Sequence, residues 1–264
     1  MKFIPRLPKD DVNVSKKNPV KEAVYLVAGV FAAALVILTI AAFFIENLIV
    51  YLPASAEVFV FQKVFPSCEE GGGGHADKLE QMRAMLARLT GQWPENPYDF
   101  RLGVVEDKDV NAMAVPGGVI LFTSAALECG FSDQEIMWIM AHELGHFHHR
   151  DHLRRFGRSA LLTFVSLAID SSASSSTGDL IDFAAELAAK KLDRSHEKAA
   201  DLFAAKMTMR LDLECLTSVG VMQRFQALDN ARASKFFKYL STHPYPDERI
   251  AYLEAFCREQ TPAR

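Results

Sequence analysis

His142, Glu143 and His146 stand at the spacing at which side chains can hold a metal ion and use it for catalysis. On an α-helix each residue turns by about 100°, so residues four apart lie on one face, and Glu143 borders the same space. Two imidazoles there can bind zinc, and a glutamate can take a proton from the water that the metal activates. The stretch therefore predicts a zinc protease centre with His142 and His146 as ligands and Glu143 as the general base.

A catalytic zinc ion needs a third protein ligand and keeps a fourth position open. Glu197 is the best candidate, because it opens a predicted helix from which its carboxylate can point at the metal. Asp201 follows one turn later on the same face, where it can accept a hydrogen bond from a ligand histidine and orient that ring. The alternative is that Glu197 and Asp201 are two solvated acids on a helix surface.

Three further histidines, His148, His149 and His152, follow the motif. His149 falls one turn beyond the two predicted ligands, which raises the question of a second metal. All three stand among arginines and an aspartate, a composition typical of an exposed helix end. We therefore expect one zinc ion per chain and no second metal site.

The motif must lie on a helix for this geometry to hold. Ser132 and Glu135 form a capping box ahead of it, and Phe131 and Ile136 stand where a hydrophobic staple would. Apolar residues then recur at helical spacing, at Ile136, Ile139, Met140, Leu144 and Phe147. Gly145 weakens this helix by about 1 kcal/mol relative to alanine. A glycine there indicates that a neighbouring segment packs too closely for a Cβ.

Two upstream segments, residues 98–105 and 112–122, have strand character and are joined by a charged turn. They predict a small antiparallel sheet beside the zinc helix. Pro116 cannot donate to a strand ladder, which confines its strand to an edge or a bulge. Such an edge can bind an extended peptide as a further strand, and the substrate-binding residues would then be Asn111, Ala112, Met113 and Ala114. An ordinary hairpin closed by a Pro-Gly turn explains the same residues.

Residues 23–45 contain no charged side chain and as a helix would be about 34 Å long, against a bilayer hydrocarbon core of about 30 Å. Lysine and arginine are more frequent before this segment than soon after it, which predicts a cytoplasmic N-terminus and an extracytoplasmic remainder. A cleaved signal peptide is the main rival, because Ala54-Ser55-Ala56 suits signal peptidase. The apolar segment is too long for one, so we favour a retained anchor over a signal peptide or a buried core helix.

The chain is long enough for one catalytic domain with appended segments. Four consecutive glycines at residues 71–74 suit a linker, and Val58 to Val64 within the same region has strand-like character. We therefore predict a cytoplasmic tail over residues 1–22, an anchor over 23–47, a linker over 48–75 and a zinc metalloprotease domain over 76–264.

The net charge of −4 and the lack of a basic stripe argue against a nucleic-acid partner. The four cysteines, Cys68, Cys129, Cys215 and Cys257, form no C-x-x-C pair. Outside the cytoplasm they would meet an oxidising compartment, so disulfides are possible. Four cysteines allow three complete pairings, and the sequence does not choose among them or indicate an oligomeric state.

The rest of the chain is predicted to be helical. Apolar periodicity marks a helix over residues 76–89, another runs from Asp179 to about residue 192, and those after Ser195 break near Asp212 and at residues 243–246. Residues 170–178, rich in serine, form either a flexible connector or a mobile lid. The fold class is therefore α+β: a mostly helical domain with a small antiparallel sheet beside the zinc helix, plus one N-terminal transmembrane helix.

Four motifs together resemble the zinc endopeptidases related to the CAAX prenyl protease and the HtpX-type proteases. They are H-E-L-G-H at residues 142–146, E-x-x-A-D at 197–201, N-A-x-A-x-P-G-G at 111–118, and T-H-P at 242–244 followed by Arg249. The resemblance spans about residues 111–250. It implies a gluzincin-type domain in which Glu197 is the third zinc ligand and Asp201 supports the site. It also implies a place near the metal for His243.

The resemblance leaves the role of His243 open. His243 or Arg249 could act catalytically by stabilising the oxyanion formed at a peptide carbonyl, or His243 could occupy the open position of zinc and hold the enzyme latent, or cap a helix. The several membrane spans of the prenyl and HtpX-type members are absent here, which favours a single-anchor subgroup concerned with quality control of envelope proteins. The alternatives are a latent, protease-like chaperone or assembly factor, and an active protease dedicated to one partner.

Overall fold

The computed structural model describes residues 18–48, 51–61, 75–158, 161, 194–231, 243–244 and 246–260. The chain divides into two compact units, Met1–Phe44 and Ile45–Arg264, and each is considered by itself. The predictions for the N-terminal tail, for the glycine run at residues 71–74, for the serine-rich segment and for a helix over 179–192 all lie outside the described residues.

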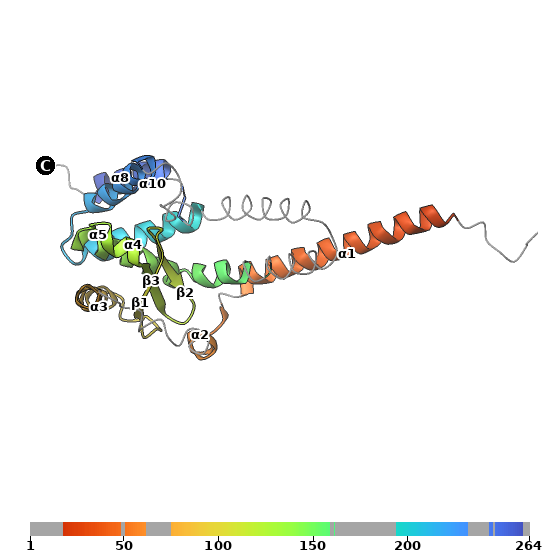
Figure 1. Ribbon diagram of the computed structural model, residues 1–264, viewed down its shortest axis with the longest axis horizontal. Coiled ribbons are helices and arrows are strands. Elements are labelled where there is room, and N and C mark those ends of the chain that lie inside the picture. The colour runs from red at the N-terminus through yellow and green to blue at the C-terminus, as the bar shows by residue number, and fades with distance from the viewer. Residues whose placement is uncertain are drawn as a thin grey trace, which may run out of the picture. The chain divides into compact units, whose positions relative to one another are not determined.

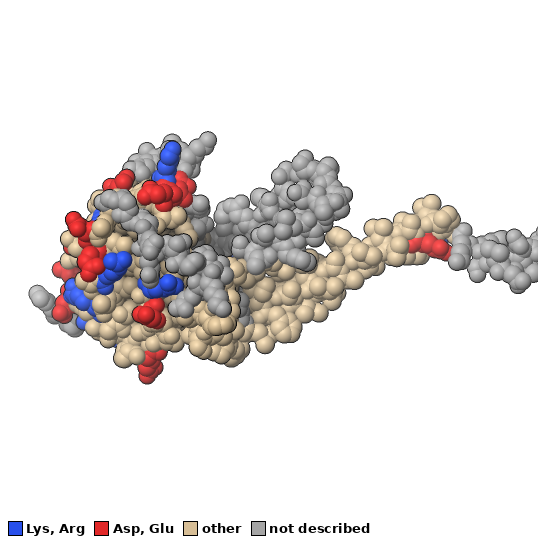
Figure 2. Space-filling model, turned by 60° about the horizontal axis from the view of Figure 1, so that its bottom comes forward, with Lys and Arg blue, Asp and Glu red and all other residues tan. Residues whose placement is uncertain are grey.

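The described part of the first unit belongs to α1 (Pro19–Leu48). Residues Pro19–Ile45 of this helix are long and apolar enough to cross a membrane, and none of their most apolar window is buried. Figure 2 shows tan, uncharged surface along most of α1. A signal sequence near the N-terminus passes the same test, so the retained anchor stays a prediction.

The sheet of the second unit contains β1 (Arg101–Val105), β2 (Ala112–Val115) and β3 (Val119–Thr123) in the order β1-β3-β2. β2 and β3 form an antiparallel hairpin, with Val115 opposite Val119. Its turn contains Gly117 and Gly118, whose φ angles of 95° and 81° favour glycine. The predicted strand over residues 112–122 is therefore two strands, and the hairpin with a Pro-Gly turn is confirmed.

The prediction of a purely antiparallel sheet is wrong, because β1 pairs with β3 in parallel. The charged turn after β1 leads to β2, but β1 and β2 are not neighbours in the sheet. β3 lies between them and pairs with both. Two reversals of chain direction bring β3 back parallel to β1. The broader prediction of a mostly helical domain with a small sheet is confirmed.

Helices surround this sheet (Figure 1). They are α2 (Ala54–Phe61), α3 (Ala76–Thr90), α4 (Ser124–Glu128), α5 (Asp133–His148), α8 (Leu216–Ala231), α10 (Pro246–Gln260), and helical residues 151–158 and 194–209. The predicted breaks near Asp212 and at residues 243–244 are confirmed. The strand predicted from Val58 onward is wrong for residues 58–61, which lie in α2, because an apolar run this short does not distinguish a strand from a helix.

α5 is the central helix of the core, and every residue from Ile136 to Phe147 is buried. Its start has the predicted capping box: the Ser132 side chain accepts from the Glu135 N–H, and the Glu135 side chain accepts from the Ser132 N–H. A helix buried all round is held by contacts from several elements at once. The side chains of the H-E-x-x-H motif therefore have little freedom to move.

A disulfide joins Cys215, just before α8, to Cys257 in α10. Cys129 is a free thiol, and Cys68 lies outside the described residues. Of the pairings that the sequence left open, the fold forms the one that ties two neighbouring C-terminal helices together.

Candidate metal centre

α5 places His142 and His146 one turn apart with both rings fully buried. The Nδ1 atom of His142 lies 2.8 Å from Asp201 Oδ1, and that of His146 lies 3.0 Å from Asp151 Oδ2. Ionised carboxylates only accept hydrogen bonds, so each Nδ1 carries the proton and each Nε2 keeps its lone pair. The two Nε2 atoms face each other at 3.0 Å. Two lone pairs at this distance need a cation between or beside them.

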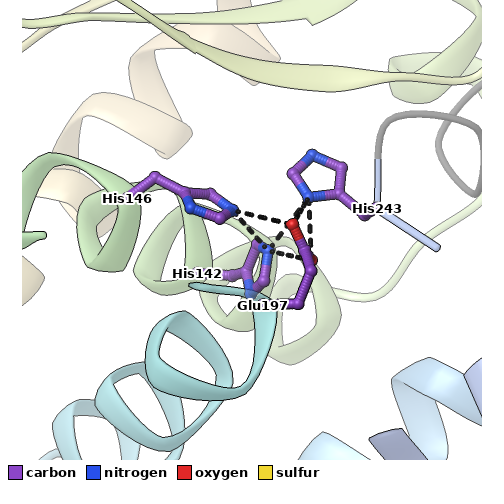
Figure 3. Close-up of side chains that lie close together, drawn as sticks. All are labelled: His142, His146, Glu197 and His243. Atoms are coloured by element: carbon purple, nitrogen blue, oxygen red, sulfur yellow. Dashed lines mark hydrogen bonds and ion pairs between the residues drawn. The ribbon is translucent and has the colours of Figure 1, made fainter. Parts of the chain in front are cut away.

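Glu197, at the start of the helix over residues 194–209, brings a third donor to these nitrogens. Its carboxylate oxygens lie 3.4 Å from His142 Nε2 and 3.5 Å from His146 Nε2. His243 Nδ1 lies 3.1 Å from Glu197 Oε2, and one ligand atom from each of these four residues falls within 4.8 Å of the others (Figure 3). Two imidazoles and a carboxylate are the donor set of a catalytic zinc site, so the residues present fit a zinc ion.

The charges around this group act in both directions: the carboxylates beside His142 favour a cation, whereas burial and the charge of Arg155 lower the pKa of His146 to about 4. Burial lowers the pKa of His142, but hydrogen bonds to Asp201 and Glu197 outweigh burial and raise it to about 9. Burial likewise opposes ionisation of Glu197, yet the interaction with His243 and the charge of Arg249 hold its pKa well below the ordinary value. Without a metal, this site therefore takes up a proton at His142. A divalent cation would displace that proton and satisfy the same carboxylates.

Glu143 lies beside the ligand group and is fully buried. Its Oε2 accepts a hydrogen bond of 2.8 Å from the Ala114 N–H, and its Oε1 lies 3.5 Å from His243 Nε2. Burial raises the pKa of Glu143 to about 7. A carboxylate with a pKa near neutrality can take up a proton and release it again, as a general base and acid must.

Three of the predicted substrate-binding residues, Ala112, Met113 and Ala114, lie in β2, which the strand order places at an edge of the sheet, and Asn111 directly precedes it. Met113 and Ala114 are partly exposed, whereas Ala112 is buried. Asn111 has only 1% of its surface exposed, and its N–H donates to Thr123 Oγ1, so it anchors the start of the strand. Met113 and Ala114 are thus the partly exposed residues of this edge strand, and the Ala114 N–H is bonded to Glu143.

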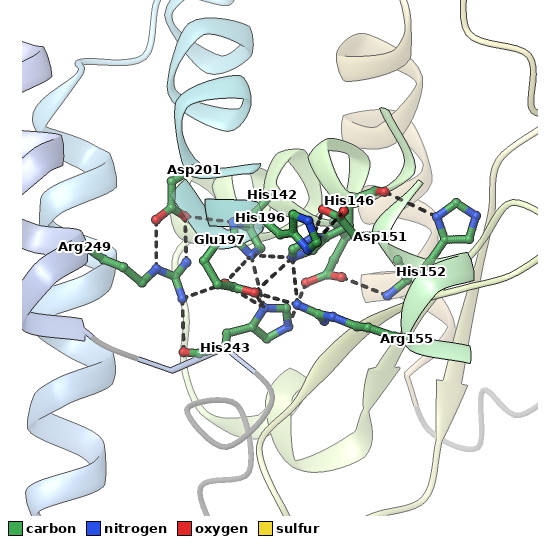
Figure 4. Close-up of polar contacts among 12 residues, drawn as sticks. His142, His146, Asp151, His152, Arg155, His196, Glu197, Asp201, His243 and Arg249 are labelled. Carbon is green, nitrogen blue, oxygen red and sulfur yellow. Dashed lines mark hydrogen bonds and ion pairs between the residues drawn. The ribbon is translucent and has the colours of Figure 1, made fainter. Parts of the chain in front are cut away.

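Arg249 contacts three residues of the candidate metal centre, Asp201, Glu197 and His243 (Figure 4). Its Nε and Nη2 donate to Asp201 at 2.8 and 2.6 Å, and its Nη1 lies 3.1 Å from Glu197 Oε2 and 3.2 Å from the His243 carbonyl oxygen. Tyr252 also donates to Asp201. Arg249 is fully buried, and these contacts join it to residues around the metal. They favour a role in positioning ligands rather than contact with a substrate.

Two charged residues of the site escaped prediction from the sequence. Asp151 orients His146, and Arg155 Nη2 donates to Glu197 Oε1 at 2.5 Å. The proximity of Asp151 to the motif in sequence was a signal. However, Asp151 reaches His146 through the left-handed backbone of Arg150, with φ of 63°. A left-handed conformation at a residue with a Cβ is uncommon, and no local sequence pattern predicts it here.

The neighbouring histidines have other partners. His148 packs against Trp93 and Phe203, with ring centroids 5.2 and 4.7 Å away. His152 contacts Glu57 through Nε2 and the His146 carbonyl oxygen through Nδ1. With 2% of its surface exposed, His152 is buried, so the expectation of an exposed helix end is wrong for this residue. Within the described residues, the side chains that could hold a metal ion together are His142, His146, Glu197 and His243, and this group contains none of His148, His149 and His152.

Comparisons with known proteins agree with this site. The sequence model described as peptidase family M48 matches residues 75–256, more than half of the chain. The matched segment contains all four residues of the ligand group together with Glu143 and Asp201. A search of curated proteins found no match. The chain belongs to peptidase family M48, the metallopeptidases of the HtpX and CAAX protease type.

Proposed function

We propose that the protein is a membrane-anchored, zinc-dependent endopeptidase. The observation that carries this proposal is the buried group of His142, His146 and Glu197 with Glu143 at its side. A zinc ion bound there supplies a Lewis acid that polarises a peptide carbonyl and acidifies water. Asp201 and Asp151 hold the two histidines in the tautomer that presents Nε2 to the metal.

Glu143 moves the protons of the reaction. Its position beside the ligands and its pKa of about 7 suit it to take a proton from the attacking water and later to give that proton to the leaving amine. The Ala114 N–H holds the Glu143 carboxylate in place and belongs to the edge strand β2. A peptide bound along β2 would therefore lie close to the base.

The substrates that we propose are unfolded or misassembled polypeptides, because an edge strand recognises extended backbone with little demand on side chains. The anchor helix and the Cys215–Cys257 disulfide support an extracytoplasmic catalytic domain, since disulfides persist in oxidising compartments. On this basis we place the enzyme in a cytoplasmic membrane, with its N-terminus in the cytoplasm and a role in envelope protein quality control.

Replacement of Glu143 by glutamine tests the proposal. Glu143 is not one of the proposed ligands, and glutamine has nearly the same shape. Purified full-length Glu143→Gln protein should therefore bind zinc as the parent does, while cleavage of casein falls by at least about 10²-fold. Glu95→Gln, at an exposed position, serves as the matched control and should leave cleavage unchanged. A chelator should abolish cleavage by the parent, and added zinc should restore it. Undiminished cleavage by pure Glu143→Gln protein would contradict the assignment.

A second candidate function is a latent, protease-like chaperone or assembly factor. The observation that favours it is His243 Nδ1, which lies 3.2 Å from His142 Nε2 and 3.1 Å from Glu197 Oε2, where it can fill the remaining position of a metal. The two functions differ in turnover. If the purified protein with zinc does not cleave unfolded proteins yet the Glu143→Gln form captures particular partners, the second candidate is correct.

A further inference from the structure

The most buried acid outside the metal centre is Glu57 in α2, with none of its surface exposed. Its Oε1 accepts from the Gly117 N–H at 2.8 Å and from His152 Nε2 at 2.9 Å. Its Oε2 accepts from the Tyr98 hydroxyl at 2.7 Å and from Arg150 Nη1 at 2.5 Å. Glu57 lies upstream of residues 75–256, the part of the chain that matches the family.

This carboxylate uses its full capacity to accept hydrogen bonds, with two donors on each oxygen. Burial alone would raise its pKa, but hydrogen bonds from His152, Gly117 and Tyr98 and the charge of His152 hold the pKa below the ordinary value. Glu57 is therefore ionised. A buried ion with four donors is stable only while the three segments that supply them, around Tyr98, Gly117 and residues 150–152, stay in place, so it joins these segments to α2.

Two of the donors flank a residue of the metal centre. Arg150 and His152 stand on either side of Asp151, whose Oδ2 lies 3.0 Å from His146 Nδ1. Arg150 adopts a left-handed backbone, with φ of 63°, which is unfavourable for a residue with a Cβ. Its side chain offsets that strain through Glu57 and through the Leu52 carbonyl oxygen, 2.8 Å from Nη2. Glu57 thus holds the turn that brings Asp151 to His146.

A third donor belongs to the substrate side of the site. Gly117 lies in the turn between β2 and β3, and the same hairpin supplies the Ala114 N–H that holds Glu143. The fourth donor, Tyr98, packs against Phe147 of α5 with ring centroids 5.2 Å apart. One carboxylate therefore contacts both the turn of the hairpin whose edge strand holds the general base and the turn that brings Asp151 to His146.

We propose that Glu57 is a positioning residue of the peptidase site, and that α2 completes the catalytic unit although it lies outside the family-matched segment. α2 begins at Ala54, soon after α1 ends at Leu48. The segment that follows the predicted anchor would then be part of the active enzyme rather than a passive linker. The effect on turnover rests on the proposed function, whereas the effects on hairpin order and metal binding do not.

The test compares the full-length parent with Glu57→Gln in detergent. Glutamine keeps the size of the side chain but replaces one acceptor oxygen by a donor amide, so at least one of the four bonds is lost. We expect hydrogen exchange of the Gly117 amide to accelerate by about tenfold or more and zinc affinity to fall by about tenfold, the size of effect seen for indirect support of ligands. The visible spectrum of the cobalt-substituted protein should shift. With casein, kcat should fall and KM should rise.

Two controls separate positioning from a general loss of stability. Glu95→Gln removes an exposed acid and should change none of these readouts. Val219→Ala in α8, a helix that carries none of the ligand-group residues, removes buried apolar surface and should lower thermal stability without changing the cobalt spectrum or Gly117 exchange. If Glu57→Gln does not fold, Tyr98→Phe, which removes one donor, should show the same changes at smaller size.

Unchanged Gly117 exchange and zinc affinity in folded Glu57→Gln protein would overturn the inference. If the parent itself fails to cleave casein, the proposed function fails, but exchange and zinc affinity still decide the role of Glu57. Loss of turnover in Glu57→Gln with unchanged exchange, metal affinity and cobalt spectrum would also count against it, because the carboxylate would then not act through the hairpin or the ligands.

Discussion

A Cβ on Gly145 would lie 2.8 Å from the Cα of Ala200 and 2.9 Å from its carbonyl oxygen. Gly145 stands between His142 and His146 of α5, and Ala200 follows Glu197 by three residues. The close approach of these two helices at a glycine therefore brings Glu197, the proposed third ligand, to His142 and His146. The sequence-based prediction that a neighbour packs too closely for a Cβ at Gly145 is confirmed.

Gly145→Ala should lose zinc and stability. Alanine would gain about 1 kcal/mol of helix propensity. The added methyl group meets backbone atoms that cannot rotate away, and such overpacking costs about 1–3 kcal/mol or more. The helix that carries Glu197 must shift, so we expect a net loss of stability and at least tenfold weaker zinc binding.

Gly220→Ala in α8 is the matched control, because nothing lies within 4 Å of a Cβ there. It should stabilise the protein by up to about 1 kcal/mol and leave zinc binding unchanged. Thermal unfolding with and without a chelator measures both variants. Equal behaviour of the two alanine variants would show that the contact with Ala200 does not constrain the site.

His243→Ala should weaken zinc binding and raise turnover of an unfolded protein. The Nδ1 atom of His243 lies within the ligand group, so its removal takes away one donor and opens a position for water. Casein cleavage and zinc competition with a chelator measure the two effects. A loss of turnover of about 10²–10³-fold with zinc retained would instead assign His243 to stabilisation of the oxyanion.

Removal of the Cys215–Cys257 disulfide should destabilise the C-terminal helices. The two cysteines are 42 residues apart, and closing a loop of this length restricts the unfolded chain by about 4 kcal/mol in the chain-entropy estimate. Denaturant unfolding of Cys215→Ser, compared with the parent, measures the loss. Cys129→Ser replaces a free thiol and should have a small effect. A parent that is insensitive to a reductant under denaturing conditions would show that the bond is not formed.

The capping box of α5 should make stability depend on pH. Burial disfavours the charge of Glu135, but hydrogen bonds from Ser132 and Arg224 outweigh burial and lower the pKa of Glu135. A lowered pKa in the folded state contributes stability above the unfolded pKa, and that stability is lost as the pH falls through the folded value. Glu135→Gln should therefore cost about 1 kcal/mol at pH 7, because the pair is partly solvated.

The difference between the parent and Glu135→Gln should shrink as the pH falls below about 4.5, where the carboxyl group becomes protonated in the unfolded and then the folded state. Unfolding by urea at several pH values measures it. The same series with Glu95→Gln should show no such dependence. A constant difference down to pH 3 would contradict the role of the charged cap.

Much of this protein can be predicted from its sequence because the signals are local. The capping box marks the start of α5, the apolar spacing follows the helix as far as Phe147, and the motif on it selects the two histidines and Glu143. Gly145 indicates a close neighbour through the mere absence of a side chain. Side chains a few residues apart on a helix must be neighbours, so their pattern carries their geometry.

Tertiary structure decided the contacts between segments far apart in the chain. No local pattern predicts the parallel pairing of β1 with β3 or the disulfide between Cys215 and Cys257. The same holds for the ion pair between Glu57 and Arg150, which are 93 residues apart. A short apolar run such as that of α2 is compatible with both a strand and a helix, and contacts with the core decide between them. A buried charge is tolerated only where several segments bring donors to it at once, and only the folded chain assembles them.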